Sequence, residues 1–256
     1  MTDYLDVRSV SKSFGGLRAL DDCSFSIEQN KSTCLVGPNG AGKTTIFNVI
    51  TGFVGPDQGS IHFRGRPLNG LTPRQIIRGG IARTFQNLRL FGEMTALENV
   101  IVYLSGDTAS GPVAALARPF HTHAELKRRR ERAHLLLAEV GLAHKAADTV
   151  QNLSFGQQKL LCIARALATG AELLLLDEPT AGLSQAALTA MVDMVHRLRE
   201  RGHTLLVVEH NTKIVQKIAD QIIFLHQGRT VTQGPPGTIL ADPKLAEIYF
   251  GGVLNP

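Results

Sequence analysis

A glycine-rich stretch in the N-terminal part of the chain constrains its fold more than any other feature. The stretch contains the pattern Gly-x-x-x-x-Gly-Lys-Thr and consists of Gly37, Pro38, Asn39, Gly40, Ala41, Gly42, Lys43, Thr44 and Thr45. An apolar run at residues 33–36 predicts a buried strand before it, and residues 44–51 predict a helix after it. In this context successive backbone N–H groups and the helix N-terminus converge on one anion. The sequence therefore predicts a phosphate-binding loop rather than an ordinary glycine turn.

The last residues of this loop predict what it binds. In such loops a lysine placed like Lys43 reaches the β- and γ-phosphates of a nucleotide. A hydroxyl placed like that of Thr44 holds Mg²⁺. We therefore expect a ligand that carries β- and γ-phosphates, together with Mg²⁺.

Size and composition set broader limits. The length of 256 residues suits one large α/β domain, or one domain with a subdomain. The net charge of +5 is compatible with anionic ligands or a membrane surface and establishes neither. The three cysteines lie in apolar stretches and predict buried thiols in a reducing compartment. No apolar run follows Met1 and no stretch approaches the ~20 apolar residues of a membrane span, so we expect a cytoplasmic protein.

Two carboxylates follow a second predicted strand. The apolar run 173–176 predicts a strand that is buried on both faces of a parallel sheet, and Asp177 and Glu178 come directly after it. The carboxyl ends of such strands face the ligand crevice, where two acids are costly without a positive charge nearby. Mg²⁺ beside Asp177 would supply that charge and leave Glu178 to act as a base on water. The alternative is a solvated strand end.

Two single residues each have two interpretations. His210 follows another apolar strand, at 204–208, and a lone histidine is often structural. Because its strand ends at the same edge of the sheet as the acids, we favour a functional role. Phe14 lies in a turn between two short strands predicted at 4–10 and 23–29. Its ring is either exposed and able to stack on an adenine, or part of the core at a strand end.

A helical segment is predicted over residues 87–165. Near its end Ser154 and Gln157 have capping-box spacing at the start of a helix. The N–H groups of that helix, the hydroxyl and the bare Gly156 predict a second anion site without a lysine of its own, with plain capping as the alternative. The basic run 127–130 lacks interleaved aromatic residues, so we interpret it as a solvated helix face and expect no nucleic-acid partner.

These motifs, taken in chain order, resemble an ABC-type ATPase cassette over essentially the whole chain. They are the phosphate loop, Gln86, the Leu-Ser-Phe-Gly-Gln sequence at 153–157, the pair Asp177-Glu178, and His210. The resemblance implies an α/β P-loop NTPase fold in a single domain spanning 1–256. Its mixed, mainly parallel sheet core and N-terminal antiparallel β subdomain would comprise 1–86 and 166–256, with the helical subdomain 87–165 inserted.

The same resemblance implies a role for each motif residue, with ATP and Mg²⁺ as the ligands. Binding of ATP falls to Phe14 on the adenine and to residues 37–45 on the phosphates. The residues that would contact the metal are Thr44, Gln86 and Asp177. In catalysis Glu178 would be the base and His210 the switch at the γ-phosphate. Gln86 would also sense the membrane partner. Ser154, Gly156 and Gln157 belong to the signature that grips the γ-phosphate bound by the opposite subunit.

The resemblance also implies partners. They are a second cassette, identical or different, arranged head to tail; transmembrane permease subunits; and, indirectly, a solute-binding protein. The implied location is the cytoplasmic face of the inner or plasma membrane, as a peripheral protein. Two positions depart from the usual pattern: Phe155 replaces a glycine of the signature, and Ser184 replaces an aspartate that often makes a contact across the dimer.

A narrower resemblance is to one group of importers, although the sequence does not name the transported solute. The segment 83–91, Met94-Thr95 and Glu98-Asn99-Val100 resemble the ATP-binding subunits of branched-chain amino acid importers. Related urea importers and a lipopolysaccharide-exporting ATPase share much of the pattern and stay open as alternatives. A soluble ABC ATPase acting on DNA or ribosomes usually carries two cassettes or a long coiled-coil insertion, and neither is visible. P-loop kinases and GTPases have no place for the Ser154 signature or for His210.

Overall fold

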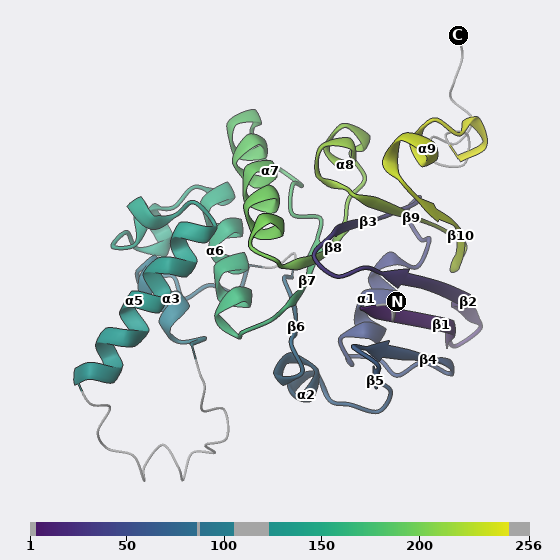
Figure 1. The fold of residues 1–256 in the computed structure, drawn as a ribbon, viewed down its shortest axis with the longest axis horizontal. Helices are drawn as coiled ribbons and strands as arrows, with labels where there is room; N and C mark the ends of the chain where they lie inside the picture. Colours follow the sequence, from purple (N-terminus) through teal and green to yellow (C-terminus); the bar gives the residue numbers. More distant parts are fainter. Residues whose placement is uncertain (1–3, 86–87, 105–122, 246–256) are drawn as a thin grey trace.

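The computed structural model describes residues 4–85, 88–104 and 123–245. Its strands form a four-stranded sheet in the order β2-β1-β4-β5 and a six-stranded sheet in the order β10-β9-β3-β8-β7-β6 (Figure 1). The strands of the first sheet are β1 (Leu5–Phe14), β2 (Leu17–Ile27), β4 (Gln58–Phe63) and β5 (Arg66–Pro67). Those of the second are β3 (Ser32–Val36), β6 (Ile81–Arg83), β7 (Leu173–Asp177), β8 (Thr204–Val208), β9 (Gln221–His226) and β10 (Arg229–Gly234).

The six-stranded sheet is mixed and mainly parallel, as predicted. Every neighbouring pair is parallel except β9 and β10, which form an antiparallel hairpin. Strand β7 explains the leucine run: Leu173 and Leu175 pack into one buried cluster, and Leu174 and Leu176 into another on the opposite face. Both faces are therefore covered, and only the strand ends are left to meet a ligand.

Helices cover both faces of this sheet. On one face α1 packs against the four-stranded sheet, because Ile46 and Phe47 share a buried cluster with Val7 and Val10 of β1. On the other face lie α6, α7 and α8. The helix bounds are α1 (Lys43–Ile50), α2 (Pro73–Arg78), α3 (Ala96–Ile101), α5 (His123–Glu139), α6 (Phe155–Ala168), α7 (Gln185–Glu200), α8 (Thr212–Ile218) and α9 (Pro236–Leu240), with 3₁₀ turns at Ala143–Lys145 and Val150–Asn152.

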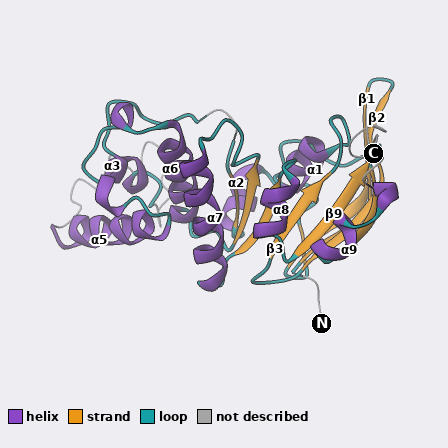
Figure 2. Cartoon of the chain, turned by 90° about the horizontal axis from the view of Figure 1, so that it is seen from above, coloured by secondary structure: helices purple, strands orange, loops and turns teal. Residues whose placement is uncertain are grey.

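Helices α3, α5 and α6 contact one another at the end of the molecule away from the four-stranded sheet (Figure 2). Thr95 caps α3 through a capping box with Glu98, and Ala133, Leu136 and Leu137 of α5 are fully buried against this group. The predicted subdomain boundaries stay predictions.

The N-terminal strands are longer than their alternation predicted. Strand β1 continues to Phe14 through register shifts after Val7 and Val10, and Ser9 adopts a left-handed backbone conformation with φ of 48°. Each irregularity changes which side chains face inward. A prediction that requires strict alternation therefore ends the strand too early. Within the described ranges, no helix combines the length and apolarity needed to cross a bilayer.

Candidate nucleotide-binding site

The predicted phosphate loop joins β3 to α1, and its backbone requires glycine. Gly37 has φ of 151°, and a Cβ there would lie 2.0 Å from the Leu225 carbonyl oxygen. Gly42 has φ of 103°, and a Cβ there would lie 2.7 Å from the Ala19 carbonyl oxygen. Gly42 is also the N-cap of α1 and supplies no side chain to cap it. No side chain of the N-cap residue therefore accepts a hydrogen bond from the first-turn N–H groups of α1. These groups are left to bind an anion, as a phosphate site requires.

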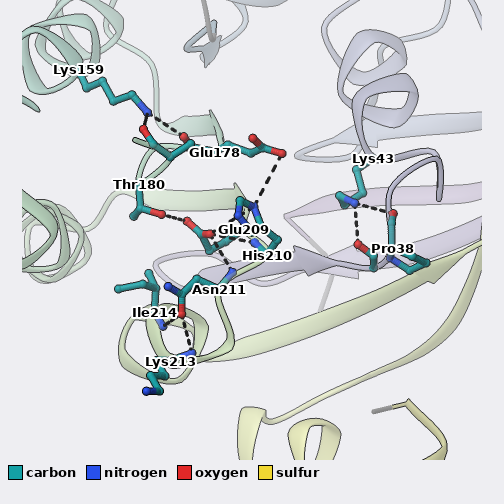
Figure 3. A network of polar contacts seen from close by, with 12 residues as sticks. Pro38, Lys43, Lys159, Glu178, Thr180, Glu209, His210, Asn211, Lys213 and Ile214 are labelled. Carbon is teal, nitrogen blue, oxygen red and sulfur yellow. Dashed lines mark hydrogen bonds and ion pairs between the residues drawn. The ribbon is translucent and has the colours of Figure 1, made fainter. Parts of the chain in front are cut away.

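Lys43 begins α1, and its side chain folds back over the loop. Its Nζ donates to the carbonyl oxygens of Gly37 at 2.7 Å and Pro38 at 2.8 Å (Figure 3). Burial lowers the pKa of Lys43, and the negative charges of Glu178 and Asp177 oppose that shift. The ammonium therefore lies within the field of both the predicted base, Glu178, and the predicted metal-supporting acid, Asp177.

Asp177 ends β7 and is paired with Arg83 at the end of β6. The Arg83 guanidinium lies 2.7 Å from Asp177 Oδ2, and both side chains are 6% exposed. Arg83 also donates to Asn48 Oδ1 of α1 at 2.6 Å and lies over the rings of Phe47 and Phe85. The sequence argument assigned the positive charge near Asp177 to Mg²⁺ alone. The structure adds Arg83, which connects β7, the helix of the phosphate loop and the segment leading to Gln86.

Glu178 and His210 follow neighbouring strands and face each other. The Glu178 N–H donates to the Val208 carbonyl oxygen at 3.0 Å, which fixes the end of β7 beside the end of β8. His210 Nδ1 lies 4.0 Å from Glu178 Oε1 (Figure 3). Glu178 adopts a left-handed conformation with φ of 47°, which is rare for a residue with a Cβ. Such strain persists only where surrounding contacts enforce it, and it is concentrated at functional sites.

The signature residues start α6, as predicted. Ser154 is the N-cap and forms a capping box in which its hydroxyl accepts from Gln157 N–H at 3.3 Å. A Cβ on Gly156 would lie 2.8 Å from Ala187 Cβ, so close packing against α7 is one reason for glycine there. Helices α6 and α1 lie apart in both overall views (Figures 1 and 2). The two predicted anion sites are therefore not merged within one chain.

Phe155 and Ser184 are the positions that depart from the usual pattern. The Phe155 ring is half-exposed, and its centroid lies 5.2 Å from the Lys159 ammonium. A Cβ added to Gly182 would lie 3.4 Å from this ring. Ser184 is the N-cap of α7, without a side-chain capping bond. Both residues border the loop that follows Glu178.

Phe14 and Gln86 complete the predicted set. The Phe14 ring is 47% exposed at the end of β1, which disfavours the interpretation as a core residue. Gln86 lies outside the described residues. The segments on either side of it line a cavity of ≈630 Å³ that also includes Thr44 and Asp177. Phe53 and Phe85 meet edge to face at its rim, with ring centroids 5.7 Å apart, and both are about half-exposed.

Known proteins match this chain over most of its length. It is 38% identical over 248 residues to the high-affinity branched-chain amino acid transport ATP-binding protein LivG of Salmonella typhimurium, covering 96% of this chain and 97% of LivG. Residues 20–181 match the family described as ABC transporter. The chain belongs to the ABC transporter family. The family and fold predicted from the sequence are thereby confirmed, and this ABC cassette is an ATPase that binds ATP and ADP.

Solved structures of other ABC cassettes have the same fold. The crystal structure of the ADP conformation of MJ1267, an ATP-binding cassette of an ABC transporter, matches with a TM-score of 0.84 and 32% identity, covering 98% of this chain and 100% of that one. The dimeric post-hydrolysis state of the cassette MJ0796, bound to ADP and Pi, matches with a TM-score of 0.72 and 26% identity, covering 91% and 98% respectively. Transporter cassettes of this kind act with membrane subunits and dimerise.

Three charged residues at this site were not predicted from the sequence. They are Arg83 and Glu209, together with Lys159, whose Nζ donates to the Glu178 and Ala181 carbonyl oxygens at 3.1 and 2.7 Å. Arg83 and Glu209 each end or follow a strand of the sheet, as Asp177 and Glu178 do. That position was a signal available in the sequence. Lys159 carries no comparable signal, because its contacts join residues on separate elements.

Proposed function

We propose that this ABC cassette hydrolyses ATP to drive the import of branched-chain or other hydrophobic amino acids through permease partners. The observation that carries the substrate class is the identity to LivG across nearly the full length of both chains. The motif residues would perform the hydrolysis in the roles argued below.

The phosphate loop 37–45 binds the triphosphate. Phosphate oxygens are charged acceptors and form stronger hydrogen bonds than the two carbonyl groups that Lys43 now contacts. The Lys43 ammonium therefore transfers readily from the loop to the β- and γ-phosphates. The half-exposed Phe14 ring offers a flat apolar surface on which the adenine stacks.

Thr44 and Asp177 fit Mg²⁺. Both are oxygen donors, both line the same cavity, and Mg²⁺ in nucleotide sites takes few protein ligands because phosphates and water supply the rest. Gln86 is the third residue that we assign to the metal, on the resemblance alone. Mg²⁺ bound here would neutralise charge on the β- and γ-phosphate oxygens. No group of three or more His, Cys, Asp or Glu residues suited to a metal gathers anywhere in the described ranges.

Glu178 acts as the general base. Its carboxylate accepts a proton from a water whose oxygen attacks the γ-phosphorus, while the bond from that phosphorus to the bridging oxygen breaks. His210 faces the same space, 4.0 Å from Glu178, and donates to a γ-phosphate oxygen. Lys43 balances charge on the leaving diphosphate. Each residue stands at the end of β7 or β8 or at the start of α1, so rigid elements hold the whole set.

Two cassettes share each nucleotide. The Ser154 turn of α6 carries a hydroxyl and a helix N-terminus but no lysine, and it lies apart from α1 of its own chain. A head-to-tail partner brings that turn onto the γ-phosphate held by Lys43. ATP then favours the closed dimer, and hydrolysis removes the phosphate that both chains grip.

The permease docks at the aromatic rim of the cavity. Phe53 and Phe85 expose apolar surface there, next to the segment that contains Gln86. A membrane subunit seated on this rim would contact residues that also reach Asp177 through Arg83. Opening and closing of the dimer is thereby transmitted to the permease. The cassette would act from the cytoplasmic face of the membrane, and a solute-binding protein would deliver the amino acid to the permease on the other side.

Uptake measurements test this function. Deleting the gene should abolish high-affinity uptake of labelled leucine, isoleucine and valine, while urea uptake stays unchanged as the matched control. The wild-type gene should restore leucine uptake, and a Glu178→Gln gene expressed at the same level should not. Normal leucine uptake in the deletion strain, or a loss of urea uptake instead, would overturn the proposed substrate class.

A further inference from the structure

Glu209 is a buried acid to which the mechanism above assigns no role. It follows β8, is fully buried, and lies next to His210 in the sequence. A carboxylate buried in this way is costly unless hydrogen bonds satisfy it. Its contacts therefore show what it holds in place.

The two oxygens of Glu209 bind two different loops. Oε1 accepts the backbone N–H groups of His210 at 2.9 Å and Asn211 at 3.0 Å, in the loop after β8. Oε2 accepts the Thr180 hydroxyl, in the loop after β7 (Figure 3). One side chain thus joins the segment carrying His210 to the segment carrying Glu178.

Helix capping does not account for this arrangement. The N-cap of α8 is Asn211, whose Oδ1 accepts from Lys213 N–H at 3.0 Å and Ile214 N–H at 3.3 Å. The bond from Thr180 to Glu209 is not needed to start that helix. It spans two loops at the ligand edge of the sheet.

The loop after β7 is also held from its other side. Lys159 of α6 donates to the carbonyl oxygens of Glu178 and Ala181. Residues 178–181 therefore lie between Lys159 and Glu209, and Figure 3 shows both attachments together. Contacts on two sides enforce the left-handed backbone of Glu178, which would otherwise relax.

We propose that Glu209 is a positioning residue for ATP hydrolysis, which through Thr180 fixes the Glu178 carboxylate relative to the His210 imidazole. The proposal rests on the proposed roles of Glu178 and His210. It predicts that removing the hydrogen bond between Thr180 and Glu209 slows the chemical step. ATP binding should stay unchanged, because the phosphate loop is not altered.

The test compares Thr180→Val, which keeps the shape and removes the hydroxyl, with Thr180→Ser, which keeps the hydroxyl. The matched control is Thr204→Val, since Thr204 is also buried, lies at the opposite end of β8, and has a hydroxyl that accepts Asn30 N–H at 2.9 Å. Thr180→Val should lower kcat by about tenfold, the lower end for a hydrogen bond to a charged group, with ATP affinity within about twofold of wild type. Thr180→Ser should recover most of that loss, and Thr204→Val should keep the wild-type kcat.

Several outcomes would overturn the proposal. They are a kcat for Thr180→Val equal to that of Thr204→Val, a loss of kcat in Thr180→Ser as large as that in Thr180→Val, or a loss of ATP affinity that accompanies the loss of kcat.

A second variant, Glu209→Gln, can still accept both N–H groups and donate to Thr180, so its kcat should fall between those of wild type and Thr180→Val. Glu178→Gln is measured alongside. Wild-type turnover in that variant would refute the assigned base itself, which is a separate failure from that of the Thr180 link.

Discussion

The ion pair between Arg83 and Asp177 makes the account testable by stability alone. We consider Arg83→Met, which keeps an unbranched side chain between the rings of Phe47 and Phe85 and removes the charge. Asp177 is then left buried with no cation at 2.7 Å, and Asn48 Oδ1 loses its donor at 2.6 Å. Both pair members are 6% exposed, so water does not readily replace the guanidinium.

The expected magnitude follows from this burial. Removing one partner of a buried ion pair destabilises a protein by about 3–5 kcal/mol, because the remaining charge is left uncompensated. The apolar contacts kept by methionine favour the lower end of that range. We therefore expect the free energy of unfolding of Arg83→Met to fall by about 3 kcal/mol.

Urea unfolding of the purified chain measures this change. The double variant Arg83→Met/Asp177→Asn removes both charges and should lose less stability than Arg83→Met alone. Arg83→Lys keeps the positive charge and removes the planar guanidinium, so it separates the effect of the charge from that of the paired N–H donors. Because we place Mg²⁺ at Asp177, adding Mg²⁺ with a non-hydrolysable ATP analogue should stabilise Arg83→Met more than wild type.

Two results would refute this reasoning. One is a loss of less than about 1 kcal/mol in Arg83→Met, which is the range of exposed ion pairs. The other is a double variant no more stable than Arg83→Met, because the cost would then come from packing and not from the charge left on Asp177.

Three further predictions concern other parts of the account. Lys43→Ala should weaken ATP binding by about tenfold or more, measured by titration calorimetry, and an unchanged affinity would contradict the phosphate cradle. Ser154→Arg should abolish ATP-dependent dimers in size-exclusion chromatography while each monomer still binds ATP; dimers at the wild-type level would count against a shared nucleotide. Burial raises the pKa of Cys23 and Cys162 to about 11 and raises that of Cys34 as well. Since the thiolate is the reactive form, iodoacetamide at pH 8 should alkylate the folded protein far more slowly than the urea-unfolded chain.

Local signals predicted the elements that position the site. The phosphate loop was recognisable because its glycines are required by the backbone itself, as the approach of Gly37 to Leu225 illustrates. The leucine run 173–176 predicted burial on both faces because polar residues are absent from it. The capping box at Ser154 needed only the spacing to Gln157. Each of these signals lies within a few neighbouring residues.

What sequence reasoning missed depends on contacts between distant residues. Arg83 and Asp177 are 94 positions apart and meet only because β6 pairs with β7. Thr180 and Glu209 are 29 positions apart and meet because β7 pairs with β8. Phe14 could not be assigned to core or surface because register shifts in β1 break the alternation that reports burial. Strand order, which no local pattern specifies, decides the first two cases, and irregular strand pairing decides the third.

The rate of ATP hydrolysis by Glu178→Gln tests the central claim most directly. Initial rates at saturating ATP and Mg²⁺ would be compared for wild type and Glu178→Gln, with nucleotide affinity measured on the same samples. The account predicts a fall of roughly 10²–10⁴-fold in kcat, the range for loss of a general base, with ATP binding retained. Turnover near the wild-type rate would show that the carboxylate at the end of β7 does not activate water, and the proposed mechanism would be wrong.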